Sequence, residues 1–101
     1  MAGHPDITAE DLHQRILDIL EYGSILYNNP HLFERMRQRG YSIADVYHIL
    51  KNGKILKFEK QGTERYNCQV HGEDLEGSKG AVVTIVMKRR RMLIVTVLGG
   101  M

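Results

Sequence analysis

The apolar residues in the first half of the chain recur every three or four positions, which is the period of an amphipathic helix. One such run follows the capping box Thr8-Ala-Glu-Asp11 and stops at a glycine, so it predicts a helix over residues 9–22. Another follows the capping box Ser42-Ile-Ala-Asp45 and also stops at a glycine, which predicts a helix over residues 43–52. Both helices therefore carry start and stop signals of their own.

A shorter helix is predicted between these two, over residues 30–39. Asn29 can cap it, Pro30 suits its first position, and Gly40 can end it in the left-handed conformation. A short strand at residues 24–27 is expected to precede it.

The helix over residues 30–39 carries a stripe of nitrogen-bearing side chains. His31, Arg35 and Arg39 recur every four residues along one shoulder of its apolar face. Two interpretations remain open: a solvated surface helix, or an anion site that contains a titratable imidazole.

From Lys54 onward the apolar period changes from helical to alternating. Residues 54–60 and 64–71 predict a hairpin with one wet face, while residues 81–88 and 92–98 are apolar on both faces. Strands of the latter kind are expected in the middle of a sheet, covered on each side. The sequence therefore predicts an α+β fold, in which N-terminal helices pack on one face of a mainly antiparallel four- to five-stranded sheet.

Composition is typical of one soluble globular domain. The 101 residues are 43% hydrophobic and 26% charged, and we expect a flexible stretch at 1–8 and a globular part over 9–98. Neither a signal peptide nor an apolar run long enough for a membrane is visible, so a cytoplasmic location without a membrane partner is expected. Cys68 is the only cysteine and the histidines lack ligand spacing, so neither a metal nor another cofactor is expected.

Charge is unevenly distributed although the formal net charge is only +2. Residues 1–30 carry one base and five acids, whereas residues 31–101 carry thirteen bases and seven acids. Such asymmetry favours a polyanion-facing surface in the part of the chain that follows the more acidic first helix. The run from Lys88 to Arg91 is predicted to be a basic hairpin turn, which is either solvated or able to hold phosphates.

Internal cleavage of RNA needs a base for the 2′-OH, an acid for the leaving 5′-oxygen and cations for the phosphorane. His31 is the titratable candidate, Arg35 and Arg39 can hold the phosphate, and Arg65 or Tyr66 can reach in from the sheet. The alternative role of Tyr66 is core packing. Fingerprints of Ser-His-Asp hydrolases, P-loops and Rossmann folds are absent.

The pattern that joins His31, Arg35, Arg39, Gly40 and Tyr41 continues through Asp45-Val46, Leu50 and Gly53 to Tyr66, Gly72 and Ile94-Val-Thr96-Val. Over residues 29–98 it resembles the domain-of-unknown-function 4258 (DUF4258) family, which is placed with RelE-like toxins. The layout of residues 12–50 is also similar to the motility quorum-sensing regulator (MqsR) toxin, an mRNA interferase.

The resemblance implies helices on a curved sheet, endoribonuclease activity with or without the ribosome, and a neighbouring antitoxin with a zinc-finger domain. It places the recurrent histidine and arginines of the family on His31, Arg35 and Arg39, and its recurrent threonine on Thr96. The catalytic lysines of characterised interferases have Lys57 and Lys88 as candidate counterparts here.

Two functions follow as hypotheses. In the first, the protein is a metal-independent endoribonuclease of a toxin-antitoxin system, with catalytic His31, Arg35, Arg39 and Tyr66 and a supporting Thr96. Its predicted RNA-binding residues are Lys57, Arg65, Lys88, Arg89, Arg90 and Arg91. In the second, it is a non-catalytic binding module or inactive toxin relative that contacts protein or nucleic acid.

Overall fold

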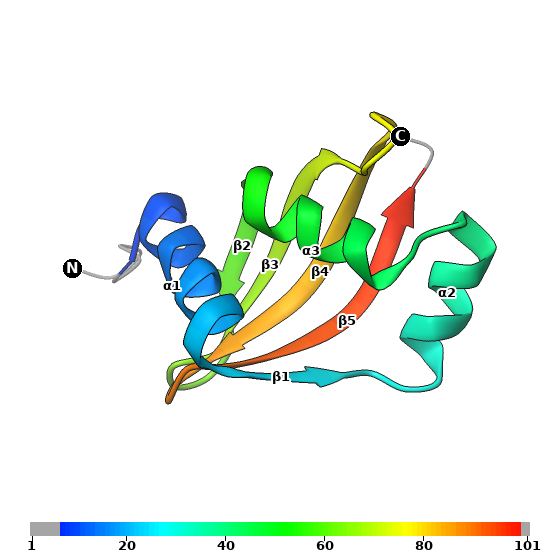
Figure 1. Cartoon of the computed structure of the whole chain (residues 1–101). Helices are drawn as coiled ribbons and strands as arrows, with labels where there is room; N and C mark the ends of the chain where they lie inside the picture. Colours follow the sequence, from blue (N-terminus) through cyan, green and yellow to red (C-terminus); the bar gives the residue numbers. More distant parts are fainter. Residues whose placement is uncertain (1–6, 100–101) are drawn as a thin grey trace.

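The computed structural model describes residues 7–99, which form three helices and one five-stranded sheet (Figure 1). The elements, in chain order, are α1 (Ala9–Tyr22), β1 (Ser24–Tyr27), α2 (His31–Arg39), α3 (Ile43–Asn52), β2 (Lys54–Lys60), β3 (Tyr66–Glu73), β4 (Lys79–Met87) and β5 (Arg91–Gly99). The predicted α+β class is therefore confirmed, and so are the predicted bounds of α1, β1 and α3.

Both predicted capping boxes are present. The Thr8 hydroxyl accepts from the Asp11 backbone N–H at 3.1 Å, and the Asp11 carboxylate accepts from the Thr8 N–H at 3.3 Å. Ser42 and Asp45 repeat the arrangement at α3. Each box satisfies backbone donors that a helix start would otherwise leave unpaired.

The predicted start of α2 is wrong by one residue. Pro30 occupies the N-cap position with φ −91° and ψ −7°, and no side chain caps the helix. Asn29 instead donates its N–H to the carbonyl oxygen of Tyr27 at 2.8 Å, so it belongs to the turn that leaves β1. The end of the helix is as predicted, because Gly40 has φ 71°.

The strand order in the sheet is β1-β5-β4-β3-β2. The short β1 lies at one edge and runs parallel to the start of β5, where Tyr27 pairs with Ile94, while the other pairs are antiparallel. The first hairpin differs from its prediction: β3 begins at Tyr66, because Glu64 has φ 60° and belongs to the turn.

The core lies between the sheet and two helices, α1 and α3, which cover one face of it (Figure 1). The helices contribute fully buried Leu12, Ile16, Val46 and Leu50. The strands turn a matching set of buried side chains to the same face: Tyr66, Cys68, Val70, Val82, Thr84, Val86, Met92, Ile94 and Val97. We call this the inward face of the sheet.

The prediction that the last two strands are covered on each side is wrong. No helix within residues 7–99 packs on the other face, which we call the outward face. The remaining helix, α2, lies instead beside the second half of β5 (Figure 1). Val83, Ile85 and Leu93 of the outward face therefore remain partly exposed, although their strands are central in the sheet.

The expected flexible stretch at 1–8 falls mostly outside the described residues. Ile7 is only 5% exposed and belongs to the core, and Thr8 caps α1. Among the described residues, no helix is both long enough and apolar enough to cross a membrane.

Candidate functional site

The stripe of His31, Arg35 and Arg39 runs along α2 as predicted. Leu32 and Met36 are buried, and the helix contacts β5. His31 and Arg39 are exposed and Arg35 is half-buried. Packing against the sheet therefore leaves the stripe accessible from solvent.

None of the three stripe residues forms an ion pair with a carboxylate within residues 7–99. Arg35 donates to the Gln38 side-chain oxygen at 3.4 Å, which is a long and weak contact. His31 makes no hydrogen bond to any described residue. The stripe thus offers two positive charges that no described carboxylate compensates, beside an imidazole, which is a chemical arrangement suited to an anion.

Three contacts of Tyr27 and Asn28, just before α2, support the start of this helix. The Tyr27 ring lies 5.8 Å from the Phe33 ring, centroid to centroid, and the Tyr27 hydroxyl is hydrogen-bonded to the hydroxyl of Tyr47 on α3. The Asn28 side chain donates to the carbonyl oxygen of Val95 at 3.3 Å. The stripe is consequently held on a supported helix.

Two glycines lie against side chains at the C-terminal end of α2. Arg39 passes over Gly99, where a Cβ would come within 3.2 Å of the Arg39 Cδ. The Tyr41 hydroxyl lies against Gly80, where a Cβ would overlap it, and it is buried without a hydrogen-bond partner among residues 7–99. Burial, followed by the charges of nearby carboxylates, raises the pKa of Tyr41, so this phenol stays protonated at neutral pH.

Tyr66 is not part of the α2 site. It is 4% exposed and lies beneath α1, with the Arg15 guanidinium carbon 5.8 Å from its ring centroid. Its row across the inward face continues through Val86 and Met92 to Ile25 of β1, whereas α2 begins only after β1 has ended. The geometry thus gives Tyr66 the packing role and separates it from His31.

The predicted basic turn forms the opposite end of the molecule from α2 (Figure 1). Arg89 and Arg90 are its central residues, with φ of 63° and 52°. Left-handed conformations cost roughly 1–2 kcal/mol for residues other than glycine, so two successive arginines are unusual in such a turn. Strain of this kind often accompanies a functional requirement, which makes the turn a candidate binding element.

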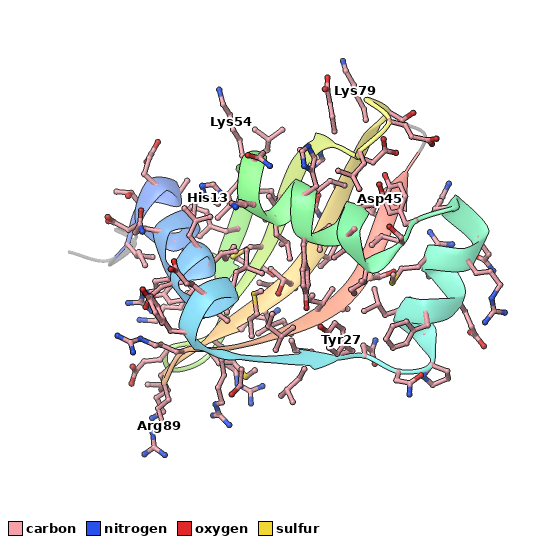
Figure 2. All side chains as sticks on the ribbon, in the orientation of Figure 1. His13, Tyr27, Asp45, Lys54, Lys79 and Arg89 are labelled. Atoms are coloured by element: carbon pink, nitrogen blue, oxygen red, sulfur yellow. The ribbon has the colours of Figure 1, made fainter. Side chains whose placement is uncertain are left out.

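The basic turn is only partly neutralised. Arg90 Nε lies 3.0 Å from Asp18 of α1, and Lys88 Nζ lies 3.8 Å from Glu64. Arg89 points away from the body of the protein (Figure 2). A hollow of about 300 Å³ lies beside the turn, lined by Arg15, Asp18, Ile19, Glu64, Met87, Lys88, Arg89 and Arg90. Arg65, in the neighbouring turn, is exposed.

Lys57 and Thr96 both lie on the outward face, which the sequence did not reveal. The register places Lys57, Gln69, Val83 and Thr96 in one row across β2, β3, β4 and β5. The Thr96 hydroxyl oxygen is buried and lacks a hydrogen-bond partner in the described part of the chain. These two predicted residues thus occupy opposite ends of a row: Thr96 lies in the half of β5 beside α2, and Lys57 lies on β2 at the far edge of the sheet.

Sequence reasoning also missed two polar residues in this region. His71 Nε2 lies 3.3 Å from the Gln69 side-chain oxygen, and Gln69 pairs with Lys57 across β3 and β2. A hollow of about 160 Å³ adjoins them, lined by Lys57, Phe58, Glu59, Asn67 and Gln69. The polar alternation of residues 64–71 was the available signal, since it predicted one wet face for this hairpin.

Within residues 7–99, no group of three histidine, cysteine or carboxylate side chains is arranged to hold a metal ion. Cys68, the lone cysteine, is fully buried, and burial raises the pKa of its thiol to about 12. It is therefore neither a thiolate nucleophile nor an exposed ligand at neutral pH.

Comparison with known proteins identifies one family. A model of the domain of unknown function DUF4258 matches residues 29–98, and the chain belongs to this family. The match runs from Asn29, just before α2, to Leu98 in β5, so it contains the α2 stripe and leaves out α1 and β1. No curated protein and no solved structure matches the chain.

Proposed function

We propose that this protein is a metal-independent endoribonuclease of toxin type that acts on single-stranded RNA in the cytoplasm. The observation that carries the proposal is the accessible stripe of His31, Arg35 and Arg39 without carboxylate partners among the described residues. Membership of the DUF4258 family and the resemblance of that family to RelE-like toxins support it. On the same resemblance, the proposed partner is an antitoxin with a zinc-finger domain.

The proposed chemistry is internal transesterification. The 2′-oxygen forms a bond to phosphorus while the bond from phosphorus to the 5′-oxygen breaks, which leaves a 2′,3′-cyclic phosphate and a 5′-hydroxyl. His31 either removes the 2′-OH proton or protonates the departing 5′-oxygen, and Arg35 and Arg39 bind the negative charge of the phosphorane. Residues 31 and 39 are about 12 Å apart along the helix, so the stripe can also contact a neighbouring phosphate.

The basic turn extends the proposed RNA-binding surface. Lys88, Arg89, Arg90 and Arg91 would contact the phosphate backbone far from the stripe, in a manner that weakens with salt. Tyr66 has no role in this proposal, because it is buried under α1.

One observation favours a second candidate function, a binding module without catalysis. The stripe consists of one imidazole and two guanidinium groups, and transesterification needs both a base and an acid. In this alternative the stripe binds RNA or an acidic protein and leaves the RNA intact.

The decisive experiment incubates the purified protein with single-stranded RNA in EDTA, with and without ribosomes. Arg37 is an exposed arginine of α2 outside the stripe, so Arg37→Ala is the matched control for His31→Ala and Arg35→Ala. We expect cyclic phosphate ends, a loss of about 10²–10³ in rate for each stripe variant, and little change for the control.

Intact RNA under both conditions would exclude the endoribonuclease. If RNA still binds, and binding falls in Arg35→Ala but not in Arg37→Ala, the binding module is the better description. Cleavage that persists undiminished in both stripe variants would show that α2 is not the site.

A further inference from the structure

The outward face of the sheet divides into an apolar half and a polar half. The cross-strand register places Leu26, Leu93 and Ile85 in one row, which continues into Asn67 and Glu59. The residues of β3 and β2 on this face are polar, whereas those of β5 and β4 are mostly apolar, with Thr96, Arg91 and Lys79 as exceptions. The apolar half consists of Leu26, Val83, Ile85, Met87, Leu93 and Leu98.

This apolar half is accessible. Leu26 is 49% exposed and the other five side chains are partly exposed. A sheet with one face toward water ordinarily carries polar residues on that face, and contiguous exposed apolar surface in a soluble protein marks an interaction site. The pattern therefore indicates that another molecule covers the outward face.

The charges around the outward face indicate which molecule. Its charged residues are Lys54, Lys57, Glu59, Glu73, Lys79 and Arg91. Four bases against two acids leave an excess of positive charge, and none of the four bases forms an ion pair within residues 7–99. Lys54 and Lys79 extend from the end of the sheet opposite Arg89 (Figure 2). An acidic partner complements this rim.

Two other occupants fit less well. A second copy of the chain would bring two rims of like charge together, which disfavours face-to-face association. Single-stranded RNA would need aromatic side chains on which its bases could stack, and the three aromatic residues of the described strands, Tyr27, Phe58 and Tyr66, all face inward.

The protein itself shows how such a face is covered. On the inward face, α1 lays Leu12, Ile16 and Ile19 against the strands, at helical spacing. A second helix on the outward face would complete a three-layer arrangement of the kind that sheets with two apolar faces adopt. Its apolar stripe would rest on β4, β5 and β1, and its acidic flank would face the bases of the rim.

We propose that the outward face binds an amphipathic helix of a partner protein, with leucine-like residues on one side and carboxylates beside them. The surface involves no residue of the α2 stripe. The proposal therefore stands whether or not the protein cleaves RNA.

The test uses two synthetic amphipathic helices of roughly 18 residues, about five turns. Both carry the same leucines at helical spacing, and their remaining positions are glutamate in one peptide and lysine in the other. Isothermal titration calorimetry with the full chain should show saturable binding of the glutamate peptide and at least about tenfold weaker binding of the lysine peptide.

Three variants locate the binding surface. Leu26→Glu removes an exposed apolar contact and Arg91→Glu inverts a charge of the rim, so each should weaken binding of the glutamate peptide at least about tenfold. Leu75→Glu is the matched control, because Leu75 is 58% exposed in the loop between β3 and β4, outside the outward face. Its binding should stay unchanged, and circular dichroism should show that all three variants are folded.

Equal binding of both peptides, or unchanged binding in Leu26→Glu and Arg91→Glu, would overturn the proposal. So would sedimentation of the free protein as a dimer that Leu26→Glu dissociates, since a second copy would then be the occupant. RNA binding that Leu26→Glu abolishes while peptide binding is absent would assign the face to nucleic acid instead.

Discussion

Asp45, labelled in Figure 2, should contribute more to stability than its place in a capping box would suggest, because its two carboxylate oxygens accept from different parts of the fold. One oxygen accepts from the N–H and hydroxyl of Ser42, at 2.8 and 3.0 Å. The other accepts from the backbone N–H of Leu75 at 3.0 Å, thirty residues further along the chain. Asp45 therefore ties the start of α3 to the loop between β3 and β4.

The perturbation is Asp45→Ala, and Asp11→Ala is its matched control. Asp11 occupies the same position in the capping box of α1, but within the described part of the chain its carboxylate accepts only from Thr8. Loss of a capping interaction costs about 1 kcal/mol, and loss of a hydrogen bond to a partly exposed charged group costs about 1 kcal/mol more. The free energy of unfolding should thus fall by about 2 kcal/mol in Asp45→Ala and by about 1 kcal/mol in the control.

Thermal unfolding followed by circular dichroism measures this difference. For a domain of about 100 residues, 1 kcal/mol shifts Tm by roughly 4–8 °C, so the two variants should be clearly separated. Equal shifts in the two variants would refute the reasoning, because the bond to Leu75 would then contribute nothing.

The same carboxylate should make stability depend on pH. Hydrogen bonds from the Ser42 and Leu75 backbones lower the pKa of Asp45 below its ordinary value. A lowered folded-state pKa means that the stabilisation is fully present above the unfolded pKa of about 3.9 and is lost as the pH falls through the folded pKa. The difference in Tm between wild type and Asp45→Ala should therefore shrink below about pH 4, and a constant difference down to pH 2 would contradict this assignment.

Two further predictions concern backbone positions. Gly80→Ala should lower Tm because its Cβ would overlap the Tyr41 hydroxyl. Adding Tyr41→Phe should recover part of the loss, since the nearest remaining ring atom would be 3.0 Å away. Equal Tm values in the single and double variants would exclude this clash. Arg89→Gly should raise the free energy of unfolding by about 1 kcal/mol, because glycine adopts positive φ without strain, while RNA affinity in a filter-binding assay falls. Arg89→Ala should lower the affinity without the stabilisation, and equal stability of the two variants would show that the turn is unstrained.

Much of the fold could be predicted because its helices are specified locally. The capping boxes at Thr8 and Ser42 and the glycine after each helix lie within a few residues of the positions they determine. The parallel pairing of β1 with β5 could not be predicted, because a four-residue strand contains no information about a partner some seventy residues away. The open outward face was mispredicted for a related reason: two apolar faces show that both can be covered, without showing that the chain itself supplies both covers.

The residues of the candidate site, too, could be predicted only where local structure determines their positions. A single helix fixes the stripe of His31, Arg35 and Arg39, so helical periodicity was sufficient to predict it. The position of Tyr66 depends on which end of the sheet α1 covers, and that is a property of the tertiary fold. The row that joins Lys57 to Thr96 depends on the register of four strands, including a bulge between Val83 and Thr84, which no local pattern encodes.

The position of α2 has a consequence for solubility. β1 pairs only with Arg91–Ile94, so the rest of β5 would be an open strand edge if α2 did not lie beside it. Unprotected edges recruit strands from other chains, and proteins usually cover them with a helix or with charged residues. The helix that carries the proposed RNA site therefore also covers a sheet edge. We expect changes at Leu32 or Met36, which are buried where α2 meets the sheet, to expose this edge and favour self-association.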